Sequence, residues 1–239
     1  MSAKWVPVLA KMDKSDVRLG RRMLAVYREK DRDLSKVAAE SSCTKGCSSC
    51  CNRLIRVTFP EAVAIAEYVI SRPEFKLDHQ RILDGMYAQL AEIKGLAPVN
   101  TRQYFEQSNP CVFLTPEKTC SIYEVRPTGC RSHFVSTAPT ACAPTSAEPV
   151  QALDTEATTY YMNSEALRVS KQTNTPLWSG PLQVMLTWAF LLLREGRQSV
   201  EALHAKDLGI LDLNRWRLLA PARETVEVTL DPSVLDTTI

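Results

Sequence analysis

Four cysteines stand within nine residues of the chain, and this cluster constrains the fold more than any other feature of the sequence. The segment reads CTKGCSSCC over residues 43–51, and its last two cysteines are adjacent. Four more follow farther along, so the complete set is Cys43, Cys47, Cys50, Cys51, Cys111, Cys120, Cys130 and Cys142. Thiols at such density are held by disulfides, by zinc or by an iron–sulfur cluster.

The cellular compartment decides whether disulfides are an option. The apolar stretch over residues 5–10 is too short for the hydrophobic region of a signal peptide, and Pro7 interrupts it. No run approaches the roughly 18 apolar residues of a membrane span. We therefore expect a soluble, cytoplasmic protein that does not bind membranes, in which thiols stay reduced and bind metal or act in redox chemistry. A net charge of +2 gives no broad surface for nucleic acid.

Helical periodicity dominates the rest of the chain. Apolar residues recur at helical spacing over 13–40, with Ser15 as the expected N-cap. Thr58 and Glu61 form a capping box, which starts a helix that ends near Ser71. Further helices are predicted over 74–94, in a short turn over 101–107, from about residue 155, over 179–193 and over 199–206. The alternating segment around 226–230 is typical of a strand.

These patterns predict a mainly α fold. With 239 residues, 45% of them hydrophobic, the chain is large enough to bury a core without a metal staple. We expect a single helical domain over 1–239, built around an irregular, cysteine-rich metal-binding core over 40–145 with at most a small β-hairpin. Flanking helices occupy 13–40 and 155–208. No alternation of strands and helices supports a parallel sheet.

The spacing within the first four cysteines favours a metal site with soft ligands. Cys47 and Cys50 have the C-x-x-C spacing of a knuckle whose two sulfurs reach one metal, and Gly46 allows the sharp turn before them. Neighbouring side chains point apart on a helix or a strand, so Cys50 and Cys51 do not easily form two corners of one zinc site. The eight thiols therefore make either two four-cysteine sites or one cluster with spare cysteines.

The first three cysteines, Cys43, Cys47 and Cys50, also have the spacing of radical S-adenosylmethionine enzymes. Ser49 replaces the aromatic residue that those motifs usually carry before the third cysteine, and no barrel pattern follows. The spacing nevertheless indicates that three of these thiols are able to hold a four-iron cluster.

The order of the cysteines and their neighbours resembles the YkgJ-type cysteine-cluster family, which is described as a zinc- or iron-chelating domain of the CxxCxxCC type. The quartet of residues 43–51 is followed by Pro-Cys at 110–111, Cys-x-Ile-Tyr at 120–123, Arg-Pro at 126–127, Cys-Arg at 130–131 and a final Cys142. The resemblance covers about residues 40–145, and the first gap of the quartet holds three residues where the family has two. It implies that all eight cysteines are metal ligands.

Three polar residues accompany the later cysteines as candidates for cofactor binding. Arg126 and Arg131 either bind an anionic substrate or, in the simpler interpretation, neutralise the charge of clustered sulfurs and brace the loop. His133 is a candidate ligand or proton shuttle, with a supporting hydrogen-bond donor or a surface residue as the alternative. The sequence identifies no catalytic residue.

Four functions remain open. The preferred one is an iron–sulfur protein, with a 4Fe-4S cluster, that acts as an enzyme or an electron carrier. The alternatives are a zinc-stabilised binding module with two four-thiolate sites, a metal carrier, and a dithiol redox protein that uses Cys47 and Cys50. Flagellin lysine methylases resemble the same family, which gives an enzymatic role a precedent by analogy. The partner is an unidentified protein or a small-molecule substrate.

Overall fold

The computed structural model describes residues 18–44, 46–72, 84–85, 88–89, 101–172, 178–194, 211–212, 216–219 and 225–228. Its α-helices are α2 (Arg18–Glu40), α3 (Phe59–Ser71), α5 (Thr101–Glu106), α6 (Thr128–Arg131), α7 (Glu156–Gln172) and α8 (Leu182–Arg194). Three short 3-10 helices lie in the loops: η2 (Ser49–Asn52), η4 (Tyr123–Val125) and η5 (Pro139–Cys142). The mainly α prediction is confirmed. Within the described residues, no helix is long and apolar enough to cross a membrane.

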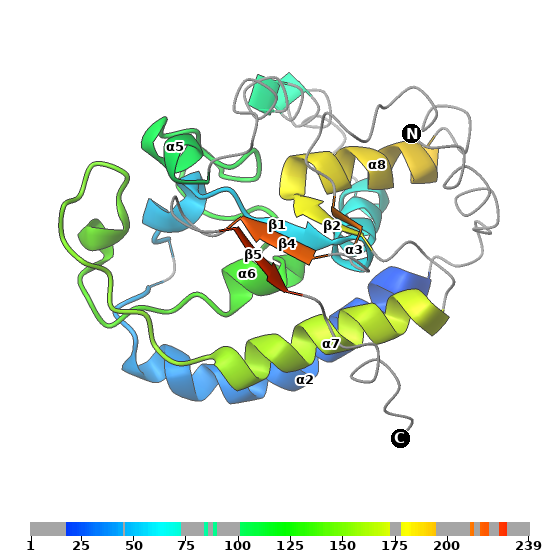
Figure 1. Cartoon of the computed structure of the whole chain (residues 1–239), viewed down its shortest axis with the longest axis horizontal. Coiled ribbons are helices and arrows are strands. Elements are labelled where there is room, and N and C mark those ends of the chain that lie inside the picture. Colours follow the sequence, from blue (N-terminus) through cyan, green and yellow to red (C-terminus); the bar gives the residue numbers. More distant parts are fainter. Residues whose placement is uncertain are drawn as a thin grey trace.

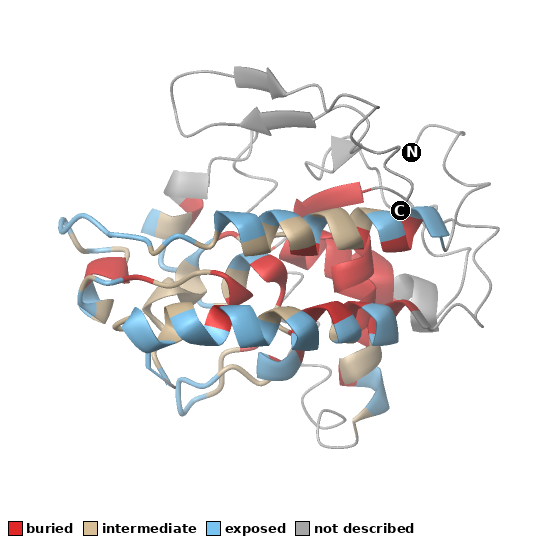
Figure 2. Cartoon of the chain, turned by 90° about the horizontal axis from the view of Figure 1, so that it is seen from below, coloured by how far each residue is buried: buried red, intermediate tan, exposed pale blue. Residues whose placement is uncertain are grey.

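Helix α3 is the centre of the fold and contacts α2, α7 and α8. Its capping box forms as predicted: the Thr58 side chain accepts a hydrogen bond from the backbone of Glu61, and the Glu61 carboxylate accepts one from the backbone of Thr58. Every residue from Phe59 to Ala66 is buried, and Ile70 alone of its large aliphatic side chains is exposed. Figure 2 shows the buried residues concentrated in α3, β2 and α8, while the outer faces of the longer helices are exposed.

Helices α2 and α7 form an antiparallel pair along one side of the molecule (Figure 1). Arg22 near the start of α2 donates a hydrogen bond of 2.9 Å to Gln172 at the end of α7. Farther along, the ammonium of Lys30 stands 4.0 Å from the centre of the Tyr161 ring. The C-terminal end of α2 and the N-terminal end of α7 therefore lie at the same end of the pair, where the cysteine-containing loops also begin and end.

A small antiparallel sheet contacts α3 and α8. Its strands are β1 (Arg56–Thr58), β2 (Trp178–Pro181) and β3 (Leu211–Asp212), in the order β1-β2-β3. Val57 stands opposite Gly180, and Ser179 stands opposite Leu211. A second pair, β4 (Trp216–Leu219) and β5 (Thr225–Val228), is also antiparallel. The β structure thus extends beyond the small hairpin that we expected, although the fold stays mainly helical.

Strand β2 corrects the predicted start of the last long helix. The sequence suggested a helix from Ser179, whereas α8 begins at Leu182. Trp178 packs edge-on between Phe59 and Trp188, with ring centres 5.9 and 4.8 Å away. This packing holds the segment extended against β1, so tertiary contacts override the local helical pattern.

The remaining predictions divide into confirmed and untested ones. Helices appear near 13–40, 101–107 and 155 as expected, and β5 occupies part of the predicted C-terminal strand. The cap at Ser15 and the helix over 199–206 lie outside the described residues. The helix over 74–94 is described only at 84–85 and 88–89, which are helical. The single domain over 1–239 stays a prediction.

Candidate metal centre

The first four cysteines lie in a tightly turned segment between the end of α2 and the start of β1. The backbone N–H of Cys47 donates a hydrogen bond to the carbonyl of Thr44 at 3.0 Å. Cys50 and Cys51 lie in the single turn of η2. Local hydrogen bonds therefore hold these cysteines close together, and neither an α-helix nor a strand is needed.

Gly46 is required by the backbone of this turn. Its φ is +91°, in the left-handed region that side chains with a Cβ disfavour. A Cβ built on Gly46 would meet nothing within 4 Å, so the constraint is the backbone angle and not the space. The sharp turn predicted from the sequence is confirmed.

Three later parts of the chain bring the other four cysteines close to this segment. The N–H of Cys111 donates to the carbonyl of Cys51 at 2.8 Å. Cys120 pairs with Leu114 across a short irregular hairpin, as predicted for this segment, and Cys130 lies in α6. Cys142 is the last residue of η5, which contacts η2. Both halves of the cysteine set thus meet in the loops at one end of the α2–α7 pair (Figure 1).

All eight cysteines are free thiols, and electrostatic interactions link them in two overlapping groups that share Cys50. Cys142 is buried, and its burial raises the pKa of its thiol. Negative charge on Cys50, Cys43 and Cys47 raises that pKa further. We call Cys43, Cys47, Cys50 and Cys142 the first group.

The remaining thiols interact in the same way with one another. Burial raises the pKa of Cys130, and negative charge on Cys111, Cys50 and Cys120 adds to the effect. The pKa of Cys51 is raised mainly by its hydrogen bond with Cys50 and by burial, and then by charge on several thiols that include Cys111 and Cys130. We call Cys51, Cys111, Cys120 and Cys130 the second group.

The two groups meet at Cys50, whose charge also raises the pKa of every thiol in the second group. A hydrogen bond from Cys51 is the main cause that lowers the pKa of Cys50, to about 6, against the opposing effect of burial. The cations Arg53 and Arg126 lower it further. The hydrogen bond between Cys50 and Cys51 brings the two side chains together, although neighbouring side chains point apart on a helix or a strand. That rule holds for α-helices and strands, whereas η2 is one turn of a 3-10 helix.

Two thiols of the second group accept hydrogen bonds from the backbone two residues farther along the chain. The N–H of Phe113 donates to Cys111, and the N–H of Ile122 donates to Cys120. Such donors stabilise a thiolate, although burial is the larger effect and raises both pKa values, that of Cys111 to about 12. Donors of this kind fit sulfurs that carry charge, as metal-bound thiolates do.

Two arginines supply positive charge to the thiols. Arg126 stacks on the Tyr123 ring, with 3.9 Å between the guanidinium carbon and the ring centre. Its charge lowers the pKa values of Cys50 and Cys120. Arg53 acts likewise on Cys50, and sequence reasoning missed it. Its position two residues after the quartet was the only available signal.

Arg131 has a different role from Arg126, although the sequence treated the two as equivalent. Its side chain is buried, forms an ion pair with Asp31 and donates to the carbonyl of Glu124 at 2.6 Å. Its guanidinium carbon lies 4.3 Å from the centre of the Tyr27 ring. These contacts match the bracing role that was one interpretation of this residue, and they tie α6 to α2.

Glu61 completes this brace. The buried carboxylate accepts four hydrogen bonds: from the Tyr27 hydroxyl at 3.0 Å, from the Thr128 N–H at 2.7 Å, and from the N–H and hydroxyl of Thr58 at 2.8 and 2.9 Å. Sequence reasoning identified Glu61 only as a helix cap. Its further contacts join α2 and α3 to α6, the helix that carries Cys130.

His133 lies against Arg53, with its ring nitrogens 3.2 and 3.4 Å from the arginine Nη1. Burial lowers its pKa, and the charge of Arg53 lowers it further. A role as ligand or proton shuttle stays a prediction.

The donor set fits a thiophilic metal. Sulfur ligands select zinc, copper(I) or iron–sulfur clusters over magnesium and calcium. In the described part of the chain, no three cysteine, histidine or acidic side chains stand in the geometry of a metal site. The loops bring the thiols within electrostatic reach of one another, and final coordination geometry would require local adjustment of the side chains.

Comparison with known proteins gives one finding. Residues 42–163 match the model of the CxxCxxCC family, described as "Putative zinc- or iron-chelating domain". No curated protein and no solved structure matches the chain. The match spans all eight cysteines and ends within α7. The protein carries a metal-binding cysteine cluster and belongs to the CxxCxxCC family of zinc- or iron-chelating domains.

Proposed function

We propose that the chain is an iron–sulfur protein whose cluster is bound by the first group. Cys43, Cys47 and Cys50 have the spacing that holds four-iron clusters, and charge on all three raises the pKa of a fourth thiol, Cys142. This grouping is the observation that carries the proposal, because four cysteine thiolates are the usual ligand set of a 4Fe-4S cluster. Such a cluster, when bound, supplies one-electron chemistry.

The second group forms a separate thiolate site in this proposal. The N–H of Cys111 donates a hydrogen bond to the Cys51 carbonyl, and Cys111 interacts electrostatically with Cys120 and Cys130 as well as with Cys50. Adjacent cysteines then serve two sites, one each, which accounts for the pair at residues 50 and 51. Free thiols in this number require a reducing environment, so we also propose a cytoplasmic location.

Zinc at both groups is the competing function, and the even division into four and four thiols favours it. Closed four-thiolate sites are the common form of structural zinc. The protein would then be a zinc-stabilised module that binds a partner. Both functions predict two sites, and they differ in the metal of the first.

Metal and sulfide analysis of anaerobically purified full-length protein separates these functions. The proposal expects brown protein that contains iron and acid-labile sulfide in near-equal amounts. Colourless protein with two zinc ions per chain would overturn it in favour of the zinc module.

Two matched variants test the division into groups. Cys142→Ser changes the first group and Cys120→Ser changes the second, and each removes one thiol. The first variant is expected to lose the visible absorption with its iron and sulfide. The second should keep them. If both variants lose all metal equally, the eight thiols form one shared site and the division is wrong.

A further inference from the structure

A cavity of about 190 Å³ lies beside the metal centre, between β1, β2, α6 and α7. Its lining includes Arg56, Thr128, Gly129, Thr159, Asn163 and Ser179. Gly129 immediately precedes Cys130 of the second group in the chain. The cavity is smaller than the 300–1,000 Å³ or so of pockets for drug-sized ligands, so its size fits a small molecule.

Arg56 contributes an uncompensated charge to this cavity. Its Nη2 is buried and has no hydrogen-bond partner, and burial lowers the pKa of the guanidinium. By contrast, Arg131 pairs with Asp31, Arg168 pairs with Glu165, and Arg126 lies close to the thiols. A desolvated cation without a counter-charge is costly, and an anion in the adjoining cavity would relieve that cost.

The other polar groups of the cavity limit the charge of that anion. The Glu61 carboxylate also lines the cavity, and its four hydrogen bonds hold it in place. Because this fixed carboxylate repels anions, the cavity disfavours a ligand with more than one negative charge, such as phosphate. A planar carboxylate also matches the fork of a guanidinium. The side chains of Thr159, Asn163 and Ser179 offer further hydrogen-bond donors.

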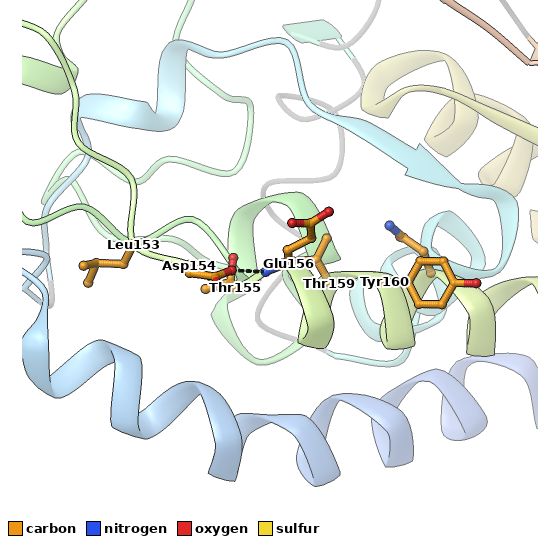
Figure 3. A pocket seen from close by; sticks show the side chains of 7 residues that line it. Leu153, Asp154, Thr155, Glu156, Thr159 and Tyr160 are labelled. Carbon is orange, nitrogen blue, oxygen red and sulfur yellow. Dashed lines mark hydrogen bonds between the residues drawn. The ribbon is translucent and has the colours of Figure 1, made fainter. Parts of the chain in front are cut away.

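An open groove on the surface adjoins the cavity. The groove has a volume of about 450 Å³, and it shares Thr159 and Asn163 with the cavity lining. Figure 3 shows its side chains around the N-terminal turn of α7, where Asp154 accepts a hydrogen bond of 2.9 Å from the N–H of Glu156. The two acidic residues make the groove unfavourable for a second negative charge. A ligand that enters past Thr159 is therefore expected to carry its only negative charge at the end that reaches Arg56.

We propose that this cavity binds the carboxylate end of a small monocarboxylic acid, with Arg56 as its counter-charge. The ligand lies next to the second group of cysteines, and its uncharged or cationic part extends toward the groove. The proposal concerns a small-molecule site that is separate from the metal ligands, so it does not depend on which metal the cysteines hold.

Isothermal titration of the full chain, in its purified metal-loaded form, tests the proposal with acetate, pyruvate and inorganic phosphate as probes. The expected result is saturable binding of acetate or pyruvate and weaker binding of phosphate. Arg56→Met is expected to weaken carboxylate binding about tenfold or more, since hydrogen bonds to charged groups are among the stronger ones. Arg168→Met is the matched control, because it removes the same charge from an exposed arginine of α7.

Several outcomes would overturn the proposal. Equal losses in Arg56→Met and Arg168→Met would show general charge attraction, and tighter binding of phosphate would show a different anion site. Carboxylate binding that is unchanged in Arg56→Met would place the acid elsewhere. If Arg56→Met does not fold, Asn163→Leu fills the passage between groove and cavity, and unchanged binding in that variant counts equally against the proposal.

Discussion

Buried charge is stabilised differently at two centres of this protein, the Glu61 carboxylate and the cysteine groups. The Glu61 carboxylate is surrounded by donors of the protein itself, and its four hydrogen bonds satisfy it. The cysteine groups bring together thiols that raise one another's pKa when they ionise, while the cations Arg53 and Arg126 favour the charged form of Cys50. The first centre is complete as folded, whereas the second is completed by a metal cation.

This difference predicts a local effect of metal removal, and it is the largest effect that we expect. Structural metal sites contribute about 10–16 kcal/mol of apparent binding free energy to the units that they fold. Removal of the metal, by a chelator together with an oxidant if iron is bound, should therefore loosen the cysteine loops over 41–55 and 109–143. Hydrogen exchange measured by mass spectrometry on the full chain should show faster exchange there.

Helix α3 is the internal reference for that experiment, because Thr58 and Glu61 cap it and it packs mainly against α2 and α8. Exchange in α3 should change little. If α3 loses protection together with the loops, the metal holds the whole fold and the contrast between the two centres fails. Reloading the metal should restore the original exchange in the loops.

Glu61→Ala disrupts the Glu61 centre and is expected to have the second-largest effect. Removal of the carboxylate leaves the N–H groups of Thr58 and Thr128 and the Tyr27 hydroxyl buried without their acceptor. We expect the free energy of unfolding to fall by about 3–5 kcal/mol, as when one partner of a buried charged network is removed. Urea denaturation measures this value.

The control for Glu61→Ala is Glu117→Ala, which removes an exposed carboxylate from the turn over 115–119. It should change the unfolding free energy by less than about 0.5 kcal/mol, as surface substitutions usually do. A similar small effect for Glu61→Ala would mean that the brace contributes little and that the core alone holds α6 in place.

The sequence predicted more of the cysteine centre than of the Glu61 centre. The ordered cysteines with their Ile-Tyr and Arg-Pro neighbours identified the family, because their spacing is a property of the chain itself. The contacts of Glu61 with Tyr27 and Thr128 span 34 and 67 residues of sequence, and no local pattern reveals them. The capping box was visible because both of its residues lie within one helical turn.

Arg126 and Arg131 show the same limit at the metal centre. The two residues flank Cys130 in the sequence and have the same side-chain chemistry, so sequence reasoning assigned them the same alternatives. Only the fold places Asp31 and the Tyr27 ring next to Arg131 while Arg126 faces the thiols. The contact between Cys50 and Cys51 was likewise hidden, because it depends on the 3-10 geometry of η2.

Gly46→Ala tests how closely the metal centre depends on the backbone of its loop. An alanine at a φ of +91° is strained by about 1–2 kcal/mol, which corresponds to roughly 5–30-fold weaker metal retention. Competition with a coloured chelator measures retention. Gly129→Ala is the matched control beside Cys130, because its added Cβ would make an ordinary contact of 3.5 Å with Ile55. Equal effects of the two substitutions would show that bulk near a cysteine, and not the backbone angle, limits retention.

Glu67 offers the smallest effect and a contrast with Glu61, since both carboxylates lie in α3. Burial raises the pKa of Glu67 to about 7 from an ordinary 4.5, although the Gly20 N–H and Arg21 favour its charged form. Its Oε1 is buried without a hydrogen-bond partner. The folded protein therefore binds this proton more tightly than the unfolded chain does. The contribution to stability is fully present below pH 4.5 and is lost as the pH rises through 7.

Glu67→Gln should flatten the pH dependence of the unfolding free energy between pH 4.5 and 7 and raise stability at pH 8, where the wild type must bury a charge. Urea denaturation at several pH values measures both changes, with Glu117→Gln as the exposed control. The gain is expected to be modest, because Glu67 is only partly buried and solvent screens its charge. A loss of stability at pH 8 would mean that the charged carboxylate is stabilised by its contacts with α2. Glu67 would then resemble Glu61 as a satisfied anion.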